Sequence, residues 1–256
     1  MITLYDNPFS PFARKVRMAL DYKGLAYDTV DALALDEHDA LVRVNPRAEV
    51  PVLVDGDCVV ANSSEIVAYL EDRSPEPALM PRSAADRAKV RRWQRLADVT
   101  FDAIVHDISL WTWPTHRRDD APPEGLLAAG MADLTRLLAL LETELVPGAH
   151  VCDALSAADF ALFPHVTSLR VLGLGTVEYP KLEAWVARMR AIPAVRKDLD
   201  YVKTAAREKF VNSPSPYEGE KVIWRGDRIE WLFRHDFVDW WVAEWRAGRA
   251  VVPSTL

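Results

Sequence analysis

Apolar positions follow one pattern over the first third of this 256-residue chain and a different pattern afterwards. In the first third, short apolar runs alternate with helical stripes, which is typical of α/β units. One such stripe is formed by Phe12, Val16 and Leu20, which recur every four residues and are followed by Gly24. Further along, two apolar runs flank Asp55-Gly56, a pair that favours a tight hairpin turn. The predicted elements are a strand at 1–5, a helix at 10–23, a strand at 26–30, a helical turn at 33–44, strands at 50–54 and 58–60, and a helix that begins at Asn62 or Ser63.

After a stretch with prolines at positions 75, 77 and 81, the strand pattern stops and the apolar period becomes helical. We predict domains at 1–76 and 83–256 with a linker at 77–82. The predicted helices are at 84–113 (ended by Pro114), 126–145, 156–172 and 181–192 (ended by Pro193). The fold class is therefore an α/β N-terminal domain followed by an all-helical C-terminal domain.

Residues from about 212 onward form an extension in which five of the nine tryptophans lie. A helix is predicted at 227–247. So many tryptophans are expected to avoid water. Two interpretations stay open: the extension seals an apolar face of the helical domain, or Trp240, Trp241 or Trp245 covers a substrate pocket as a lid.

Composition narrows the possible partners. The net charge of -7 and the pI near 5.4 argue against nucleic acid, which needs a basic surface. The start of the chain has no secretory pattern, and there is no apolar run long enough for a membrane span. Cys58 and Cys152 suit a reducing compartment, so we expect a cytoplasmic protein.

Ser10-Pro11 has the pattern of a helix start. Proline is favoured at the first helical position, and the preceding serine is then the N-cap. A thiolate placed there is stabilised by unpaired N–H groups and by the helix dipole, and the serine hydroxyl can add a hydrogen bond. Taken alone, the pair is an ordinary cap.

Two later motifs are equally ordinary when taken alone. Val50-Pro51 opens a strand and is a candidate for a cis peptide bond, which would leave the Val50 backbone free to pair with a peptide ligand. Asn62-Ser63 places polar side chains and backbone N–H groups at a helix N-terminus, which is a natural carboxylate site.

In their order, the three motifs resemble the thioredoxin-like domain of cytosolic glutathione transferases. Ser10-Pro11-Phe12-Ala13 stands where glutaredoxins have Cys-Pro-Tyr-Cys, and residues 45–53 are similar to the family's Asn-Pro-x-Gly-x-Val-Pro-x-Leu. Residues 62–70 resemble Glu/Gln-Ser-x-x-Ile-x-x-Tyr-Leu. In the second half, the capping box at 156–159 and the segment 179–195 are also similar to the family, so the resemblance covers roughly residues 1–200.

The resemblance implies glutathione as co-substrate and a small apolar electrophile as its partner, in a homodimer without metal. Ser10 would activate the glutathione sulfur, Val50 before a cis-Pro51 would pair with the cysteinyl unit, and Asn62 and Ser63 would hold the γ-glutamyl end. From the expected architecture, the electrophile pocket is predicted between residues of the first helix start and of a helical-domain helix: Phe9, Phe12, Ile108 and Trp111.

The sequence departs from the family pattern at three positions. Ala48 replaces a common glycine, Asn62 replaces an acidic residue or glutamine, and Ser10 replaces the cysteine of redox classes. A hydroxyl cannot form a disulfide, so Ser10 favours thiolate activation. Ether cleavage, dehalogenation or isomerisation at the same site, and glutathione binding without catalysis, remain alternatives.

Other constellations carry less chemistry. The histidines and cysteines have no metal-ligand spacing. Arginines and a lysine gather at 87–95, where either an anion site or a solvated helix face is possible, and the solvated face is the simpler interpretation.

Overall fold

A four-stranded sheet forms the centre of the N-terminal half in the computed structural model, which describes residues 1–32, 38–113, 120–211, 222–223 and 226–251. The strands are β1 (Ile2–Asp6), β2 (Tyr27–Asp31), β3 (Val52–Asp55) and β4 (Cys58–Ala61). Their order is β2-β1-β3-β4, with β1 and β2 parallel and the other two pairs antiparallel. The order of strands and helices along the chain that the sequence predicts is confirmed, including the hairpin at Asp55-Gly56.

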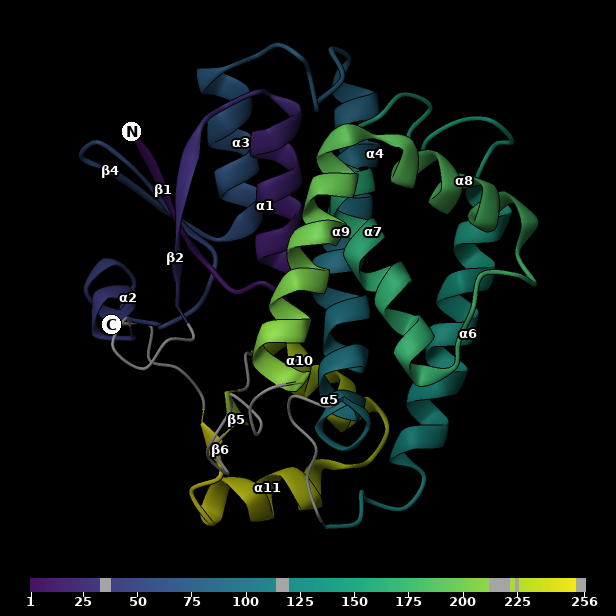
Figure 1. Ribbon diagram of the computed structural model, residues 1–256. Helices are drawn as coiled ribbons and strands as arrows, with labels where there is room; N and C mark the ends of the chain where they lie inside the picture. The colour runs from purple at the N-terminus through teal and green to yellow at the C-terminus, as the bar shows by residue number, and fades with distance from the viewer. Residues whose placement is uncertain (33–37, 114–119, 212–221, 224–225, 252–256) are drawn as a thin grey trace.

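Helices α1 (Pro11–Tyr22) and α3 (Ser63–Arg73) pack side by side against this sheet, and α2 (His38–Val44) is a short helix before β3. Figure 1 shows α1 between the sheet and the helical half, where it contacts α7 and α9. Every residue from 13 to 20 of α1 is therefore buried, charged ones included. The helix predicted at 10–23 is confirmed, with Ser10 as its cap.

The helical half contains one long interrupted rod and a set of helices packed on it. The elements are α4 (Ala84–Arg95), η1 (Leu96–Phe101), α5 (Asp102–Thr112), α6 (Leu126–Glu144), α7 (Ala157–Ser168), η2 (Leu169–Leu172), α8 (Pro180–Ala191), α9 (Pro193–Ala206) and η3 (Arg207–Val211). The helix predicted at 84–113 is confirmed as a continuous helical segment from Ala84 to Thr112, but the π-helical form of η1 in its middle was not predicted.

The prediction that Pro193 only ends a helix was also wrong. Pro193 is the first residue of α9, a helix of 14 residues that the sequence analysis missed. A proline at the first helical position loses no hydrogen bond, because the N–H there has no partner within the helix. The same residue therefore separates α8 from α9 and starts the second of them.

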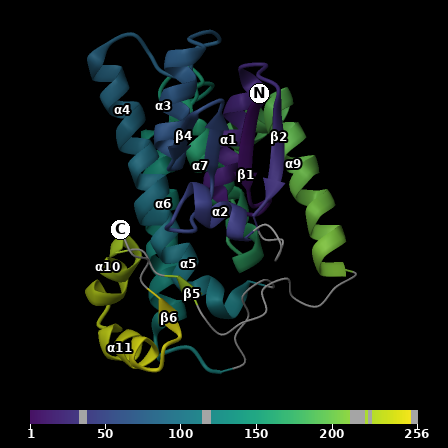
Figure 2. The same cartoon turned by 90° about the vertical axis from the view of Figure 1, so that its left-hand side faces the viewer.

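The described residues of the C-terminal extension form two helices where one was predicted. They are α10 (Gly226–Arg234) and α11 (Val238–Arg246), and the chain turns between them at Asp236, which has a φ of 64°. A short parallel pair, β5 (Val222–Ile223) with β6 (Ala250–Val251), was not predicted. Figures 1 and 2 show α10 and α11 at the foot of the helical half, and α10 packs on α5.

The two halves share one continuous hydrophobic core. Leu4 of β1 and Leu20 of α1 belong to the same buried cluster as Phe101, Phe160 and Trp185 of the helical half. The α/β plus helical fold class is thus confirmed, and the exact domain boundaries at 76 and 83 stay a prediction. The shared core fixes α1 firmly against the helical half, and the candidate site lies at the N-terminal end of that helix.

Candidate functional site

One row of residues across the sheet brings the three sequence motifs together. Tyr5 of β1 pairs with Val52 of β3, and Val52 pairs with Ala61 of β4. The loop to Ser10 leaves β1 just after this row, Val50-Pro51 enters β3 just before it, and Asn62 follows β4. Because these residues continue three adjacent strands at one end of the sheet, the motifs meet there. We call Ser10, Val50, Pro51, Asn62 and Ser63 the sheet-end corner.

Ser10 caps α1 as the sequence predicts. Its backbone is extended, with φ of -63° and ψ of 121°, and Oγ accepts a hydrogen bond from the N–H of Ala13 at 3.4 Å. This is a long bond, so the hydroxyl keeps capacity for a stronger partner. Ser10 and Pro11 are half-buried. The geometry suits a ligand atom with negative charge at the helix start.

The loop before Ser10 is held from two sides. The Asn7 side chain accepts the N–H of Phe9 at 2.9 Å, and the guanidinium of Arg17 donates to the carbonyl of Pro8 at 3.0 Å. Arg17 is buried and is also bonded to Asp198 of α9 at 2.7 Å. Ser10 is therefore positioned by a charge network that begins in the helical half.

That network consists of Asp6, Arg14, Arg17 and Asp198, which we call the charged seam. Arg14 Nε lies 2.9 Å from Asp198 Oδ2, and Arg17 Nη1 lies 2.5 Å from Asp6 Oδ1. Burial raises the pKa of Asp6 above its ordinary value, although the Coulombic attraction of Arg17 opposes this shift. The seam is not predictable from the sequence, because a helix expected to have one apolar stripe gives no reason to bury two arginines.

Val50-Pro51 has the cis peptide bond that the sequence analysis considered. Pro51 is buried and Val50 is half-buried. The register of β3 with β1 starts at Val52, and none of the hydrogen bonds between described residues involves the Val50 backbone. The Val50 N–H and C=O are thus available to a ligand that lies along the end of the sheet.

Asn62 caps α3 through a bond in which its Oδ1 accepts the N–H of Ser64 at 3.0 Å. Its φ of 73° is a left-handed conformation that asparagine tolerates better than most residues. Ser63 is the first residue of α3 and is only 4% exposed. The N-termini of α1 and α3 therefore both belong to the corner, and both favour negative charge.

A second unforeseen contact joins the corner to the rod of the helical half. The ammonium of Lys15 donates to Asp98 of η1 at 2.6 Å and to Ser64 Oγ at 3.1 Å. Ser64 Oγ also donates to Asp98, at 2.8 Å. These three side chains fix the start of α3 relative to α1 and η1. No sequence pattern indicates this contact, because the three residues are far apart along the chain.

Of the four residues of the predicted electrophile pocket, only the two phenylalanines lie beside Ser10. Phe9 and Phe12 are half-buried beside Ser10, and the Phe12 ring meets His165 of α7 edge-on, with ring centroids 6.0 Å apart. Ile108 needs correction, because it is 1% exposed and a Cβ built on Gly130 of α6 would lie 2.5 Å from its methyl group. Ile108 thus packs in the interface between α5 and α6.

Trp111 lies beneath the C-terminal extension. It is 9% exposed, and its ring packs on Trp240 of α11 with centroids 5.5 Å apart. Trp231 of α10, by contrast, is sealed against α6, where its Nε1 donates to Asp133 at 3.0 Å. Helix α10 therefore packs on the helical half as the sealing interpretation expects, and α11 contacts Trp111, while its role as a lid over a substrate pocket stays a prediction.

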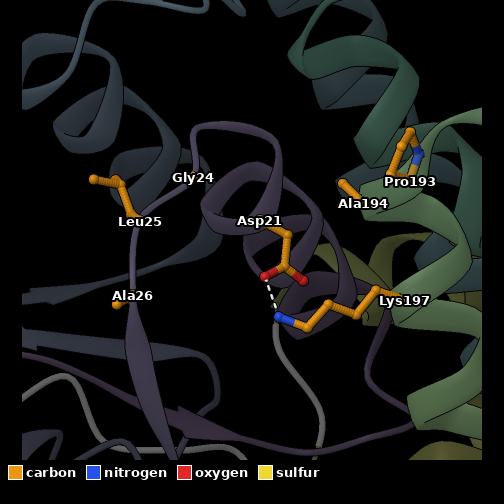
Figure 3. A pocket seen from close by; sticks show the side chains of 7 residues that line it. All are labelled: Asp21, Gly24, Leu25, Ala26, Pro193, Ala194 and Lys197. Atoms are coloured by element: carbon orange, nitrogen blue, oxygen red, sulfur yellow. Dashed lines mark hydrogen bonds and ion pairs between the residues drawn. The ribbon is translucent and has the colours of Figure 1, made fainter.

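A cavity of about 370 Å³ lies at the opposite end of α1 (Figure 3). Asp21 and Lys197 line it and form an ion pair of 2.6 Å. Ser10 and Asp21 are separated by nearly the whole length of α1, which is roughly 17 Å for 11 residues. This cavity is therefore separate from the sheet-end corner and contributes nothing to it.

Other candidate chemistry is not supported within the described part of the chain. No group of three or more histidine, cysteine or acidic residues there could hold a metal ion. Cys58 is exposed on β4, and burial raises the pKa of the Cys152 thiol to about 11, so Cys152 is a poor nucleophile. Among the described helices, none is long and apolar enough to cross a membrane.

Family models match both halves of the chain. The N-terminal domain of glutathione S-transferase matches residues 4–78, and the C-terminal domain of the same family matches residues 124–188. The first match contains all of the sheet-end corner. The second ends before α9, α10 and α11, so the extension lies outside both matched regions.

Individual relatives and solved structures are also similar to this chain over most of its length. Glutathione S-transferase GstB of Escherichia coli K12 is 31% identical over 77% of this chain and 97% of its own length. A glutathione S-transferase structure from Rhodospirillum rubrum has a TM-score of 0.67 at 30% identity, covering 78% of this chain and 92% of that one. The beta-etherase LigF of Sphingobium has a TM-score of 0.69 at 25% identity, covering 78% and 98%.

Proposed function

The chain belongs to the glutathione S-transferase family, and we propose that it binds glutathione in the sheet-end corner and directs the thiolate at an apolar electrophile. The observation that carries this proposal is the row Tyr5, Val52 and Ala61, which brings two helix N-termini and an unbonded backbone segment to one end of the sheet. Such a corner offers donors and acceptors for a short acidic peptide. A reducing cytoplasm would supply glutathione.

Ser10 stabilises the sulfur as a thiolate. An unperturbed thiol has a pKa of about 8.5, and a helix N-terminus lowers it. The Ser10 hydroxyl adds a hydrogen bond by donating its proton to the sulfur, while its oxygen still accepts the long bond from the Ala13 N–H. Thiolate formation is the main catalytic step available to these residues, because the sulfur attacks the electrophile as an anion.

The remaining residues of the corner hold the peptide. The Val50 backbone pairs with the cysteinyl unit, and Ser63 with the free N–H groups of α3 receives the γ-glutamyl carboxylate. Asn62 contributes a neutral oxygen near the α-amino group. The electrophile lies against Phe9 and Phe12, and Trp111 with Trp240 forms an aromatic wall further along α5. Ile108 has no part in this pocket.

Ether cleavage is a second candidate reaction, favoured by the similarity to the beta-etherase LigF. The glutathione thiolate would attack the ether carbon and release a phenolate, so the same corner serves both reactions. A β-aryl ether and an aryl halide, tested side by side, separate the two by the product released. We also propose a homodimer, which sedimentation equilibrium tests directly.

The deciding experiment compares Ser10→Ala with the wild-type protein. We expect the thiol pKa of bound glutathione, followed by thiolate absorbance, to rise by about one unit in the variant, corresponding to roughly 1.4 kcal/mol. Conjugation to chlorodinitrobenzene should fall about tenfold at neutral pH, while the glutathione Kd from calorimetry changes much less.

Ser83→Ala is the matched control. Ser83 caps α4 through a bond from the N–H of Asp86 at 3.1 Å, so this variant loses a comparable cap outside the corner. It should leave both thiol pKa and conjugation unchanged. Absence of glutathione binding at millimolar concentration would falsify the whole proposal. Binding without conjugation or ether cleavage of any substrate would leave only the non-catalytic alternative.

A further inference from the structure

The glycyl carboxylate of glutathione has no partner among the residues of the sheet-end corner. In the proposed function, Ser63 and the start of α3 receive the γ-glutamyl carboxylate, and the Val50 backbone pairs with the cysteinyl unit. The glycyl carboxylate lies at the other end of the tripeptide and loses part of its water when the ligand binds. A hydrogen-bond donor of the protein compensates for that loss, because charge-assisted hydrogen bonds are among the strong ones.

The order of the strands gives the direction in which the glycyl end extends. Across the sheet the strands follow one another as β4, β3, β1 and β2. The start of α3 comes directly after β4, and Val50 comes two residues before β3. A peptide that continues in the same direction brings its glycyl end to β1, and neighbouring strands are only about 4.8 Å apart.

Tyr5 is the β1 residue in the row that crosses this end of the sheet, where it pairs with Val52 of β3. Its ring packs on the small cluster formed by Ala32, Leu41 and Val52, and Val50 packs on the same cluster. Leu41 belongs to α2. The Tyr5 ring is therefore held beneath α2, at the same cluster as the residue whose backbone pairs with the ligand.

The Tyr5 hydroxyl is available to a ligand. It forms no hydrogen bond with any residue that the structure describes, and its oxygen is not enclosed, although the ring is half-buried. A tyrosine side chain has few rotatable bonds, and packing already restricts this one. The hydroxyl therefore loses little conformational freedom when it donates to a bound group.

Two cations on either side of this position are already engaged. Arg47, in the loop before β3, donates to Glu49 through Nε at 3.2 Å and through Nη2 at 3.0 Å. Lys209 of η3 forms an ion pair with Asp31, the last residue of β2. Each of these cations would have to share its charge between two carboxylates, whereas the Tyr5 hydroxyl has no partner to give up.

On the basis of the proposed function, we propose that the Tyr5 hydroxyl donates a hydrogen bond to the glycyl carboxylate, and that the site therefore selects ligands in which this carboxylate is free. Tyr5 does not act on the sulfur. Leu4 belongs to the core shared with α1, and Tyr5 packs beneath α2, because successive strand residues point to opposite faces. Thiolate stabilisation stays with Ser10, and Tyr5 contributes affinity and selectivity.

The test compares glutathione with its glycyl monoethyl ester, which keeps every other group and lacks this carboxylate. Calorimetry on the intact protein gives both Kd values. The wild type should bind glutathione about tenfold more tightly than the ester, because a hydrogen bond to a charged group is stronger than one to a neutral group. Tyr5→Phe keeps the ring and should bind glutathione about tenfold more weakly, with little change for the ester. The thiol pKa of bound glutathione should not change in this variant.

Tyr69→Phe is the matched control. Tyr69 is also half-buried, and its hydroxyl donates to Asp55 at 2.9 Å, at the other end of β3. This variant should keep the preference for glutathione over the ester. Absence of binding of both ligands to the wild type would overturn the proposed function and this role together. Equal affinities of the wild type for the two ligands, a preference that persists in Tyr5→Phe, or a preference lost in Tyr69→Phe would overturn the role of Tyr5 alone.

Discussion

Helix α1 takes part in both the sheet-end corner and the charged seam, because Ser10 caps its start and Arg14 and Arg17 lie along its buried side. At its N-terminus, Ser10 is half-buried, and its hydroxyl oxygen accepts one bond of 3.4 Å, from the N–H of Ala13 in the same helix. Along its buried side, Arg14 and Arg17 are held at 2.9 and 2.7 Å by Asp198, more than 180 residues away. The side-chain bonds of the corner are local helix caps, whereas those of the seam join distant segments.

Because of this difference, the corner and the seam should affect different quantities: the corner ligand affinity, and the seam the free energy of unfolding. Polar groups at the corner keep unused hydrogen-bonding capacity, which a ligand can take up. Charged groups of the seam are dehydrated and paired with one another as ions, so removal of one of them leaves a buried charge without compensation. Changes in the seam should therefore lower the free energy of unfolding, and changes in the corner should mainly alter ligand affinity.

Asp198→Ala should have the largest effect. It removes the partner of both Arg14 and Arg17, and breaking a buried ion pair costs about 3–5 kcal/mol. Urea unfolding measures this loss, and Asp200→Ala, an exposed carboxylate on the same helix, should stay within about 0.5 kcal/mol of wild type. If the first variant does not fold, Asp198→Asn keeps the shape and should show an intermediate loss. Equal stability of Asp198→Ala and Asp200→Ala would refute the seam.

His165 should make the helical half sensitive to acid. Burial lowers the pKa of His165 to about 4 from an ordinary value of 6.5, with the charges of Lys15 and Arg14 in the same direction and those of Asp102 and Asp98 opposed. Above pH 6.5 both the folded and the unfolded states hold a neutral imidazole, so the stability is complete.

As the pH falls from 6.5 towards 4, the unfolded state takes up a proton that the folded state does not, and stability decreases by roughly 3 kcal/mol. Urea unfolding at a series of pH values measures this slope. His165→Gln should have a visibly flatter slope over the same range. An unchanged slope in the variant would mean that other groups cause the acid sensitivity.

A smaller effect is expected at the corner itself, from Asn62→Asp. Aspartate caps a helix as well as asparagine does, and it adds the negative charge that the α-amino group of glutathione lacks here. We expect the glutathione Kd to fall about threefold, because exposed ion pairs contribute little. N-acetylated glutathione has no ammonium group and should show no gain. An equal gain for both ligands would mean that Asn62 does not face the amino group.

The contrast between corner and seam also explains what could be predicted from the sequence. Ser10-Pro11, Val50-Pro51 and Asn62 were recognisable because caps and strand starts depend on residues within three or four positions. The order of strands and helices along the chain followed from the same local patterns, whereas the strand pairing that brings the three motifs together was seen only in the structure. The fold class and the family could therefore be identified before any coordinates.

The parts that could not be predicted depend on contacts between distant segments. Lys15 looks like a surface residue until Asp98 and Ser64 are placed beside it. Ile108 looked suitable for a substrate pocket, and only the packing of α5 against Gly130 showed that its space is taken. The π-helical turn at η1 and the break at Asp236 likewise depend on tertiary packing, which no local pattern encodes.

Ala48→Gly tests whether the turn before Val50 is determined by its own backbone conformation or by more distant contacts. Ala48 has a φ of 53°, held by the bond from its own N–H to the carbonyl of Asn45 at 2.8 Å. A left-handed conformation costs a non-glycine residue about 1–2 kcal/mol, which glycine avoids. Part of this gain is lost because glycine gives up more backbone entropy on folding than alanine does. We expect a net stabilisation of about 0.5 kcal/mol in urea unfolding. Ala68→Gly, on an exposed face of α3, should instead destabilise by up to about 1 kcal/mol. Because the two substitutions are chemically identical, opposite signs can only come from the local backbone, and equal signs would show that the turn before Val50 is held by something more distant.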